Sequence, residues 1–108
     1  MGITKKELFT SEQNELASVA KALAHPARIA IIQHMIQSKT CINSDLVQEL
    51  GLAQATISQH LRELKDLQII QGNIEGVSMC YCINPEKWNE IRGLMNALFD
   101  AYPLSNCC

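Results

Sequence analysis

The sequence predicts a mainly α-helical fold that carries one small β-hairpin. Apolar residues recur at spacings of three and four over several segments, which indicates about five amphipathic helices. The stretch 69–83 instead alternates apolar and polar residues around a short turn, as a two-stranded hairpin does. The chain has 108 residues, a length that supports one domain, so residues 1–108 are expected to fold as a unit.

Composition limits the partners this chain is expected to bind. Hydrophobic residues make up 47% of it, enough for a modest core that pairing with a second copy would complete. The net charge of −2 argues against indiscriminate binding to nucleic acid. Residues 1–40 carry five basic and three acidic residues (+2), whereas the remainder carries four and eight (−4). Any affinity for DNA should therefore depend strongly on position along the chain.

No targeting or membrane segment is evident in the sequence. The first residues lack an apolar run of signal-peptide length, and no stretch approaches the ~20 apolar residues of a membrane span. The cysteines number five, which is odd. We therefore expect a cytoplasmic protein without membrane contacts, whose cysteines are reduced and serve reactivity, metal binding or packing.

The first two helices are expected over residues 10–24 and 26–38. Thr10 and Gln13 have the spacing of a capping box, and Pro26 suits the first turn of the second helix. The side chains of the second helix expected to point inward are Ile29, Ile32, and Met35 or Ile36. Arg28 lies in the first turn, where a cation is electrostatically unfavourable, so another group should hold it.

Residues 43–67 predict two short helices joined by a tight turn. Asn43 can cap the first, and its apolar face comprises Leu46, Val47 and Leu50. Gly51 stands where a helix end needs positive φ. The second helix runs from about Gln54 to Leu67. Its apolar residues Ile57, Leu61 and Leu64 share one face.

The opposite face of this second helix is polar. It carries Ala55, Gln59, Arg62 and Asp66, flanked by Thr56 and Ser58. A helix with branched aliphatic side chains inward, and amides, hydroxyls and one Arg outward, suits the DNA major groove. His60 lies at the edge of the apolar face, where we expect a partly buried structural histidine.

The run QATISQHLRELKDLQIIQG and the upstream LAHPARIAII resemble the arsenical-resistance-repressor (ArsR/SmtB) family over roughly residues 12–84. The resemblance implies a dimeric winged helix-turn-helix that represses transcription from a palindromic operator in double-stranded DNA. The residues expected at DNA are Gln54, Ala55, Thr56, Ser58, Gln59, Arg62 and Arg28. Gln59 suits a bidentate contact with adenine, and Arg62 suits a phosphate contact. For Arg28, a phosphate contact and a packing salt bridge are equally open.

Two positions depart from the family pattern. Ala53 stands at the N-cap of the helix expected over residues 54–67, the proposed DNA-reading helix, where the family usually has Ser. Because Ala is a poor cap, this substitution costs the helix ~1 kcal/mol of stability. Gln68 stands where the family usually has Gly after that helix. If Gln68 adopts positive φ, it stores strain of order 1 kcal/mol.

The strands of the expected wing are 69–71 and 77–83, with 73–76 at the tip. On the second strand Val77, Met79, Tyr81 and Ile83 share one face, and Ser78, Cys80 and Cys82 share the other. Related wings usually carry Arg or Lys that grip phosphate. This one has neither, and Glu75 is at its tip, so it is expected to add little DNA affinity.

The last helix is expected over residues 85–102, with Asn84 as its cap. Its apolar stripe comprises Trp88, Ile91, Met95, Leu98 and Tyr102. The resemblance implies that this helix and the first one, which contributes Leu16, form the interface of a homodimer. Packing within the monomer is the alternative. We favour dimerisation because so wide an exposed apolar face would otherwise be a liability.

The cysteines suggest an effector site, but no cofactor follows with certainty. Cys107 and Cys108 are adjacent thiols, which suit a soft metal or metalloid such as trivalent arsenic or antimony. The third thiol would be Cys41, Cys80 or Cys82, although the wing pair also suits simple packing. Ile42 and Ser44 stand where many relatives have Cys-x-Cys, and the last helix has no His. A redox or sulfur sensor using Cys41 with Cys107 or Cys108, and a regulator without an effector, both remain open.

Another function class is a winged-helix protein-interaction module, which the acidic net charge and the base-free wing favour. Salt dependence separates the two, because counterion release makes DNA affinity fall steeply with salt. An enzyme is disfavoured. The sequence has no Cys-x-x-Cys, no evident Ser/His/Asp arrangement and no Gly-rich phosphate loop.

Overall fold

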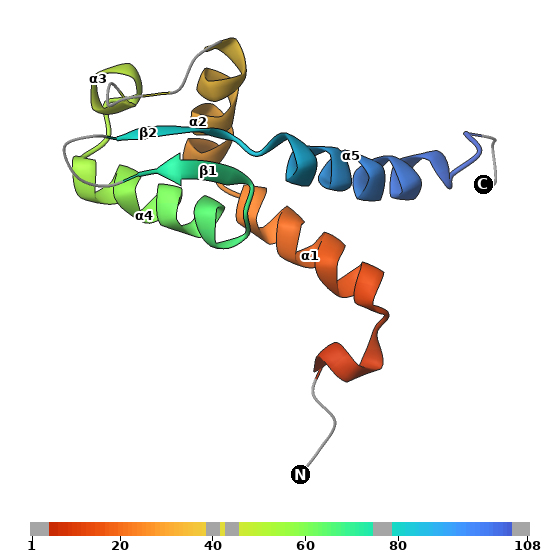
Figure 1. Ribbon diagram of the computed structural model, residues 1–108. Helices are drawn as coiled ribbons and strands as arrows, with labels where there is room; N and C mark the ends of the chain where they lie inside the picture. The colour runs from red at the N-terminus through yellow and green to blue at the C-terminus, as the bar shows by residue number, and fades with distance from the viewer. Residues whose placement is uncertain (1–4, 39–41, 43–45, 75–78, 105–108) are drawn as a thin grey trace.

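The structure, a computed structural model, describes residues 5–38, 42, 46–74 and 79–104. A short 3₁₀ helix, η1 (Lys5–Leu8), precedes α1 (Ser11–Leu23), α2 (Pro26–Gln37), α3 (Leu46–Leu50) and α4 (Gln54–Asp66). The strands β1 (Ile70–Asn73) and β2 (Cys80–Ile83) follow, and α5 (Pro85–Asp100) comes last. The prediction of five helices and a two-stranded hairpin is confirmed (Figure 1).

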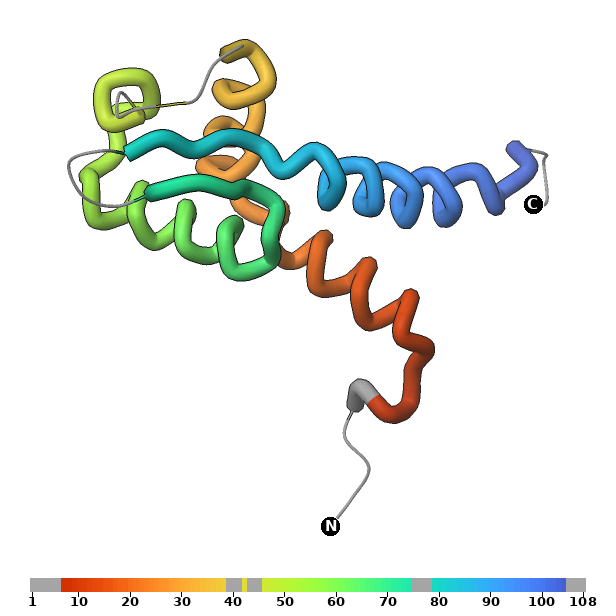
Figure 2. Tube along the Cα trace, in the orientation of Figure 1, coloured from red at the N-terminus to blue at the C-terminus, as the bar shows by residue number. Residues whose placement is uncertain are grey.

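The helices divide into a body and two arms. Helices α2, α3 and α4 gather with the hairpin at one end of the molecule, and α1 and α5 extend away from it (Figure 2). The two arms contact each other. None of the helices in the described ranges is long and apolar enough to cross a membrane.

Helix caps fix where α1, α2 and α5 begin. The capping box of α1 is confirmed, because Thr10 Oγ1 accepts from the Gln13 N–H at 3.1 Å and Gln13 Oε1 accepts from the Thr10 N–H at 2.9 Å. Asn84 Oδ1 accepts from the first N–H groups of α5. His25 caps α2 through Nδ1, which accepts from the Ala27 N–H at 3.0 Å. The cap by His25 was not foreseen from the sequence.

The core lies between α1, α2, α4 and the hairpin, with single contributions from α3 and α5. Its buried apolar residues are Val19, Ala22, Ile31, Ile32, Met35, Ile42, Leu46, Ile57, Leu61, Leu64, Ile69, Ile70, Ile74, Tyr81 and Ile91. Burial raises the pKa of Tyr81 to about 12, so its phenol stays protonated within the core.

The hairpin is antiparallel, and its register pairs Ile70 with Ile83 and Gly72 with Tyr81. Its second strand begins at Cys80, later than the expected residue 77, and residues 75–78 of the expected tip and strand lie outside the described residues. Ile42 adds a backbone pair to the outer edge of this strand. Its N–H donates to the Tyr81 carbonyl at 2.9 Å, and the Tyr81 N–H donates back at 3.3 Å.

The predicted inward face of α2 was wrong in part. Ile29 and Ile36 are 40% and 57% exposed, whereas Ile31, which was not expected inward, is fully buried beside Ile32 and Met35. At 100° per residue, positions 29 and 36 lie about 20° apart and roughly 90–115° from the middle of the buried set. The packed face is centred near Met35, because α1, α3, α4 and β2 all contact this helix. Val47 of α3 is likewise exposed, not inward.

Candidate nucleic-acid interface

Helix α4 presents two contrasting faces. Ile57, Leu61 and Leu64 are almost completely buried, which confirms the predicted inward face. The residues predicted to face outward are exposed along the helix: Gln54, Ala55, Thr56, Gln59 and Arg62. Ser58 is partly buried, and its Oγ accepts from Gln54 Nε2 at 3.2 Å. Helix α4 therefore exposes an edge of amides, hydroxyls and one guanidinium.

The start of α4 has no side-chain cap. Ala53 has extended backbone angles and makes no capping hydrogen bond, as the sequence predicted. The first N–H groups of the helix thus have no partner from the capping side chain, and such groups favour an anion.

The end of α4 is a left-handed turn. Gln68 has φ 63°, which confirms the conditional expectation for this position. Its N–H donates to the Lys65 carbonyl at 2.8 Å, and the Ile69 N–H donates to the Leu64 carbonyl at 3.0 Å. These two bonds are those of a Schellman motif, which normally uses Gly at this position. Gly51, with φ 68°, occupies the corresponding position after α3.

Arg28 is partly buried and binds within the subunit. Its Nε donates to His60 Nδ1 at 3.1 Å, and its Nη1 donates to the Ala22 carbonyl at 3.0 Å. The group expected to hold this cation is therefore an imidazole and a carbonyl near the end of α1. A carbonyl at a helix C-terminus is a favourable partner for a cation.

His60 is the one buried polar residue among those the structure describes, with 7% of its surface exposed. Its ring centroid lies 4.4 Å from that of His25. Desolvation, then His25, then Arg28 lower the pKa of His60 below its usual 6.5, and Glu63 opposes them. The imidazole is therefore neutral at pH 7. Sequence spacing places His60 on α4 but gives no sign of its contact with Arg28, which is 32 positions away.

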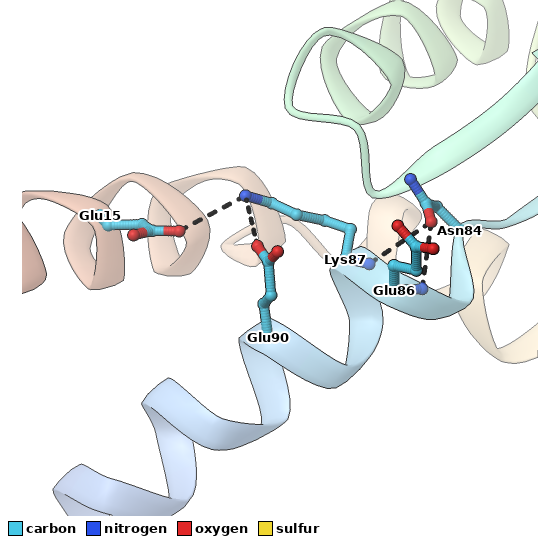
Figure 3. Close-up of polar contacts among 5 residues, drawn as sticks. All are labelled: Glu15, Asn84, Glu86, Lys87 and Glu90. Atoms are coloured by element: carbon cyan, nitrogen blue, oxygen red, sulfur yellow. Dashed lines mark hydrogen bonds and ion pairs between the residues drawn. The ribbon is translucent and has the colours of Figure 1, made fainter.

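An ion pair ties the two arms together. Lys87 of α5 points towards α1, where its Nζ lies 3.5 Å from a carboxylate oxygen of Glu15 (Figure 3). The same ammonium lies 3.6 Å from a Glu90 oxygen. This pairing links α5 to α1 where the two arms contact each other.

The predicted interface stripe on α5 divides into two halves. Ile91 is buried, and Trp88 and Met95 are partly buried against the core. Further along, Leu98, Phe99 and Tyr102 are 55%, 64% and 53% exposed. Leu98 also lines a hollow of about 330 Å³ between α1 and α5, together with Leu16 and Leu94. The first half therefore packs within the monomer, whereas the side chains of the second half are more than half exposed in the described part of the chain.

Comparison with known proteins identifies the family. Residues 25–71, which hold α2, α3 and α4, match the family described as bacterial regulatory protein, arsR family. The arsenical resistance operon repressor of Bacillus subtilis is 30% identical over the whole of both chains. The transcriptional repressor PagR of Bacillus anthracis is 32% identical over 76% of this chain and 82% of its own. The chain belongs to the arsR family.

Solved structures of ArsR-family proteins share this fold. The repressor BigR of Xylella fastidiosa superposes with a TM-score of 0.62 at 21% identity, over 96% of this chain and all of its own. An ArsR-family regulator at 17% identity reaches 0.69 over 91% of this chain and all of its own. The homodimeric winged helix-turn-helix DNA-binding domain Mb0332 of Mycobacterium bovis reaches 0.60 at 22% identity, over 97% and 94%. These likenesses confirm the winged helix-turn-helix fold.

The cysteines of this ArsR-family chain are only partly described. Cys41, Cys107 and Cys108, the residues predicted to bind an effector, lie outside the described residues. Cys80 is disulfide-bonded, whereas composition had led us to expect reduced thiols. Cys82 is a free thiol whose Sγ accepts from Gln71 Nε2 at 3.8 Å. Within the described ranges, no three His, Cys, Asp or Glu residues lie close enough to hold a metal ion.

Proposed function

We propose that this chain is a homodimeric, cytoplasmic repressor that reads a palindromic operator with α4. One observation carries the proposal: the outward edge of α4 is polar and exposed, while its inward edge is fully buried and fixes the helix on the body. A helix held in this way can enter the major groove without rearranging the core. The family, whose curated relatives are named as repressors, supports the same function.

The side chains of α4 divide by chemistry. The amide of Gln59 can donate to and accept from the edge of adenine, and Thr56, Ser58 and Gln54 can reach bases or phosphates. Ala55 leaves room for close approach or contacts a thymine methyl group. Arg62 is a cation at the side of the same face and suits a phosphate. A phosphate contact by Arg28 would use the guanidinium N–H groups that His60 and Ala22 leave over.

The test begins by selecting a duplex from a random library with the full-length protein. Gln59→Ala should weaken binding to the selected duplex by about tenfold, since a bidentate base contact contributes ~1–3 kcal/mol. The matched control is Gln33→Ala, an exposed Gln on α2, which should bind as wild type. Equal affinities of the two variants would remove α4 from the reading role.

Salt dependence separates DNA recognition from a protein-interaction role. The logarithm of the affinity should fall linearly with the logarithm of salt concentration, and Arg62→Ala should reduce the slope by about 0.9 per lost phosphate contact. If no duplex is selected and affinity does not respond to salt, the protein-interaction module becomes the better reading.

The dimer interface of the proposal is the more exposed half of α5 with the facing part of α1. Leu98, Phe99 and Tyr102 are each more than half exposed and share this end of the molecule. A second copy would cover them and space the two α4 helices about one DNA turn apart, ~34 Å. Leu98→Glu should shift sedimentation equilibrium towards monomer, whereas the control Asn96→Glu adds the same charge on the same helix and should leave the dimer intact. A monomeric wild type would rule out this assembly.

We also infer that, once the disulfide at Cys80 is reduced, a thiol-reactive effector releases the operator through Cys107 and Cys108, with Cys41 as a third thiol. The support is chemical, because neighbouring thiolates prefer soft ions such as trivalent arsenic. Arsenite should weaken DNA binding of the wild type and not of the double variant Cys107→Ser, Cys108→Ser. An unchanged response in the variant would exclude the two terminal thiols from the mechanism.

A further inference from the structure

The side chain of Arg28 connects three helices, α1, α2 and α4. Arg28 of α2 donates to the carbonyl of Ala22 on α1 at 3.0 Å and to Nδ1 of His60 on α4 at 3.1 Å. Both bonds are within hydrogen-bond range for N–H donors. The position of α4 on the body thus depends on a polar link as well as on the apolar core.

The link to α4 requires a neutral imidazole. Arg has only donors and stays charged, so His60 must accept through an unprotonated Nδ1. A proton on that nitrogen would remove the acceptor and place two cations 3.1 Å apart. His60 is 7% exposed, so water can do little to screen this repulsion. Protonation therefore breaks the link between Arg28 and His60.

The charged groups around His60 decide how readily its imidazole takes up a proton. The His25 ring lies tilted against it with the ring centroids 4.4 Å apart, Arg28 bonds to it, and both disfavour a positive charge on His60. Glu63, one turn along α4, is the opposing carboxylate. His25, Arg28 and Glu63 also line a cleft of about 660 Å³ with Lys21 and Asp66. Because His25 is exposed in this cleft, solvent reaches the edge of the cluster.

His60 lies between the residues assigned to DNA. Gln59 precedes it, Arg62 follows two positions later, and all belong to one rigid helix. We propose that His60 is a positioning residue whose neutral imidazole anchors α4 through Arg28, so that acidification releases the anchor and weakens DNA binding. The effect on DNA binding rests on the proposed function, whereas the loss of the Arg28–His60 hydrogen bond on protonation does not.

The experiment compares the full-length wild type with two Asn variants from pH 8 to pH 5.5. In His60→Asn, Oδ1 takes the place of Nδ1 and accepts from Arg28 but does not titrate. In the control His34→Asn, the same change is made on α2, in a residue that is no part of this cluster. Affinity for the selected duplex is measured together with NMR of the imidazole rings and of the α4 amides.

In the wild type and in His34→Asn, affinity should fall by up to about tenfold per pH unit and per protomer once the pH is below the pKa of His60. The α4 amide shifts should follow the His60 ring titration with the same midpoint. His60→Asn should lose most of this pH dependence. In His25→Asn the midpoint should move to higher pH, because one of the groups that lower the pKa of His60 is gone.

Two results would overturn the inference: the same pH dependence in His60→Asn as in the wild type, or α4 amides that do not respond when the His60 ring titrates. The second result is read on the wild type and does not depend on whether a variant folds. Absence of DNA binding at every pH, with the amides still following the ring, would refute the proposed function and leave the release of α4 established.

Discussion

The left-handed turn at Gln68 gives a sharp test of how the reading helix ends. Gln68 is exposed and has φ 63°, a conformation that costs a residue with a Cβ atom ~1–2 kcal/mol. Gly removes this cost. It also makes the unfolded chain more flexible, which opposes the gain by ~0.4–1 kcal/mol. Gln68→Gly should therefore raise the free energy of unfolding by about 0.5–1 kcal/mol.

Thermal unfolding followed by circular dichroism measures the effect, at fixed protein concentration because a dimer's stability depends on it. The expected rise in Tm is about 2–6 °C for a chain of this size. Gln33→Gly is the matched control, since the same change in the middle of α2 should cost ~1 kcal/mol. A lower Tm for Gln68→Gly would refute the reasoning, because it would mean that the residue is not held in the left-handed conformation.

Three further substitutions or conditions test other parts of the structure. Ala53→Ser supplies the missing cap of α4 and should stabilise by ~0.5–1 kcal/mol in urea unfolding; no gain would mean that the cap geometry is unsuitable. Gly72→Ala should destabilise by about 2 kcal/mol or more, because φ is 108° and a Cβ would collide with the Cys80 carbonyl and the Tyr81 backbone; an unchanged urea midpoint would contradict this. The pKa of His60 is lower folded than unfolded, so stability should be complete above pH 6.5 and fall as the pH drops below it. Urea unfolding at pH 7.5 and 5.5 measures this loss, which His60→Asn should reduce.

Short-range sequence patterns made the helices and the two faces of α4 predictable. Ile57, Leu61 and Leu64 are set by spacing within one helix, and the Thr10–Gln13 capping box spans three positions. Such short-range patterns follow from helix geometry alone. The left-handed angle at Gln68 was predicted only as a condition, because the family resemblance places Gly at this position.

Contacts between distant segments were not predictable in the same way. The bond between Arg28 and His60 depends on how α2 crosses α4, and no periodicity encodes that crossing. The errors on α2, where Ile29 was expected inward and Ile31 was not, arose because an apolar-rich helix has several candidate faces and only its neighbours select one. Sequence alternation likewise predicted two strands but not the third backbone segment at Ile42.

The backbone pair between Ile42 and Tyr81 has a mechanical consequence. It fastens the second strand of the hairpin, at the residue paired with Gly72, to the chain ahead of α3 with two hydrogen bonds, one in each direction. The hairpin is also continuous with α4 through Ile69 and with α5 through Asn84, whose N–H donates to the Ile69 carbonyl at 2.9 Å. We therefore expect the hairpin, α3 and α4 to move as one rigid unit when α5 tilts. A small tilt of α5 at the proposed dimer interface would then change the position of α4 relative to DNA.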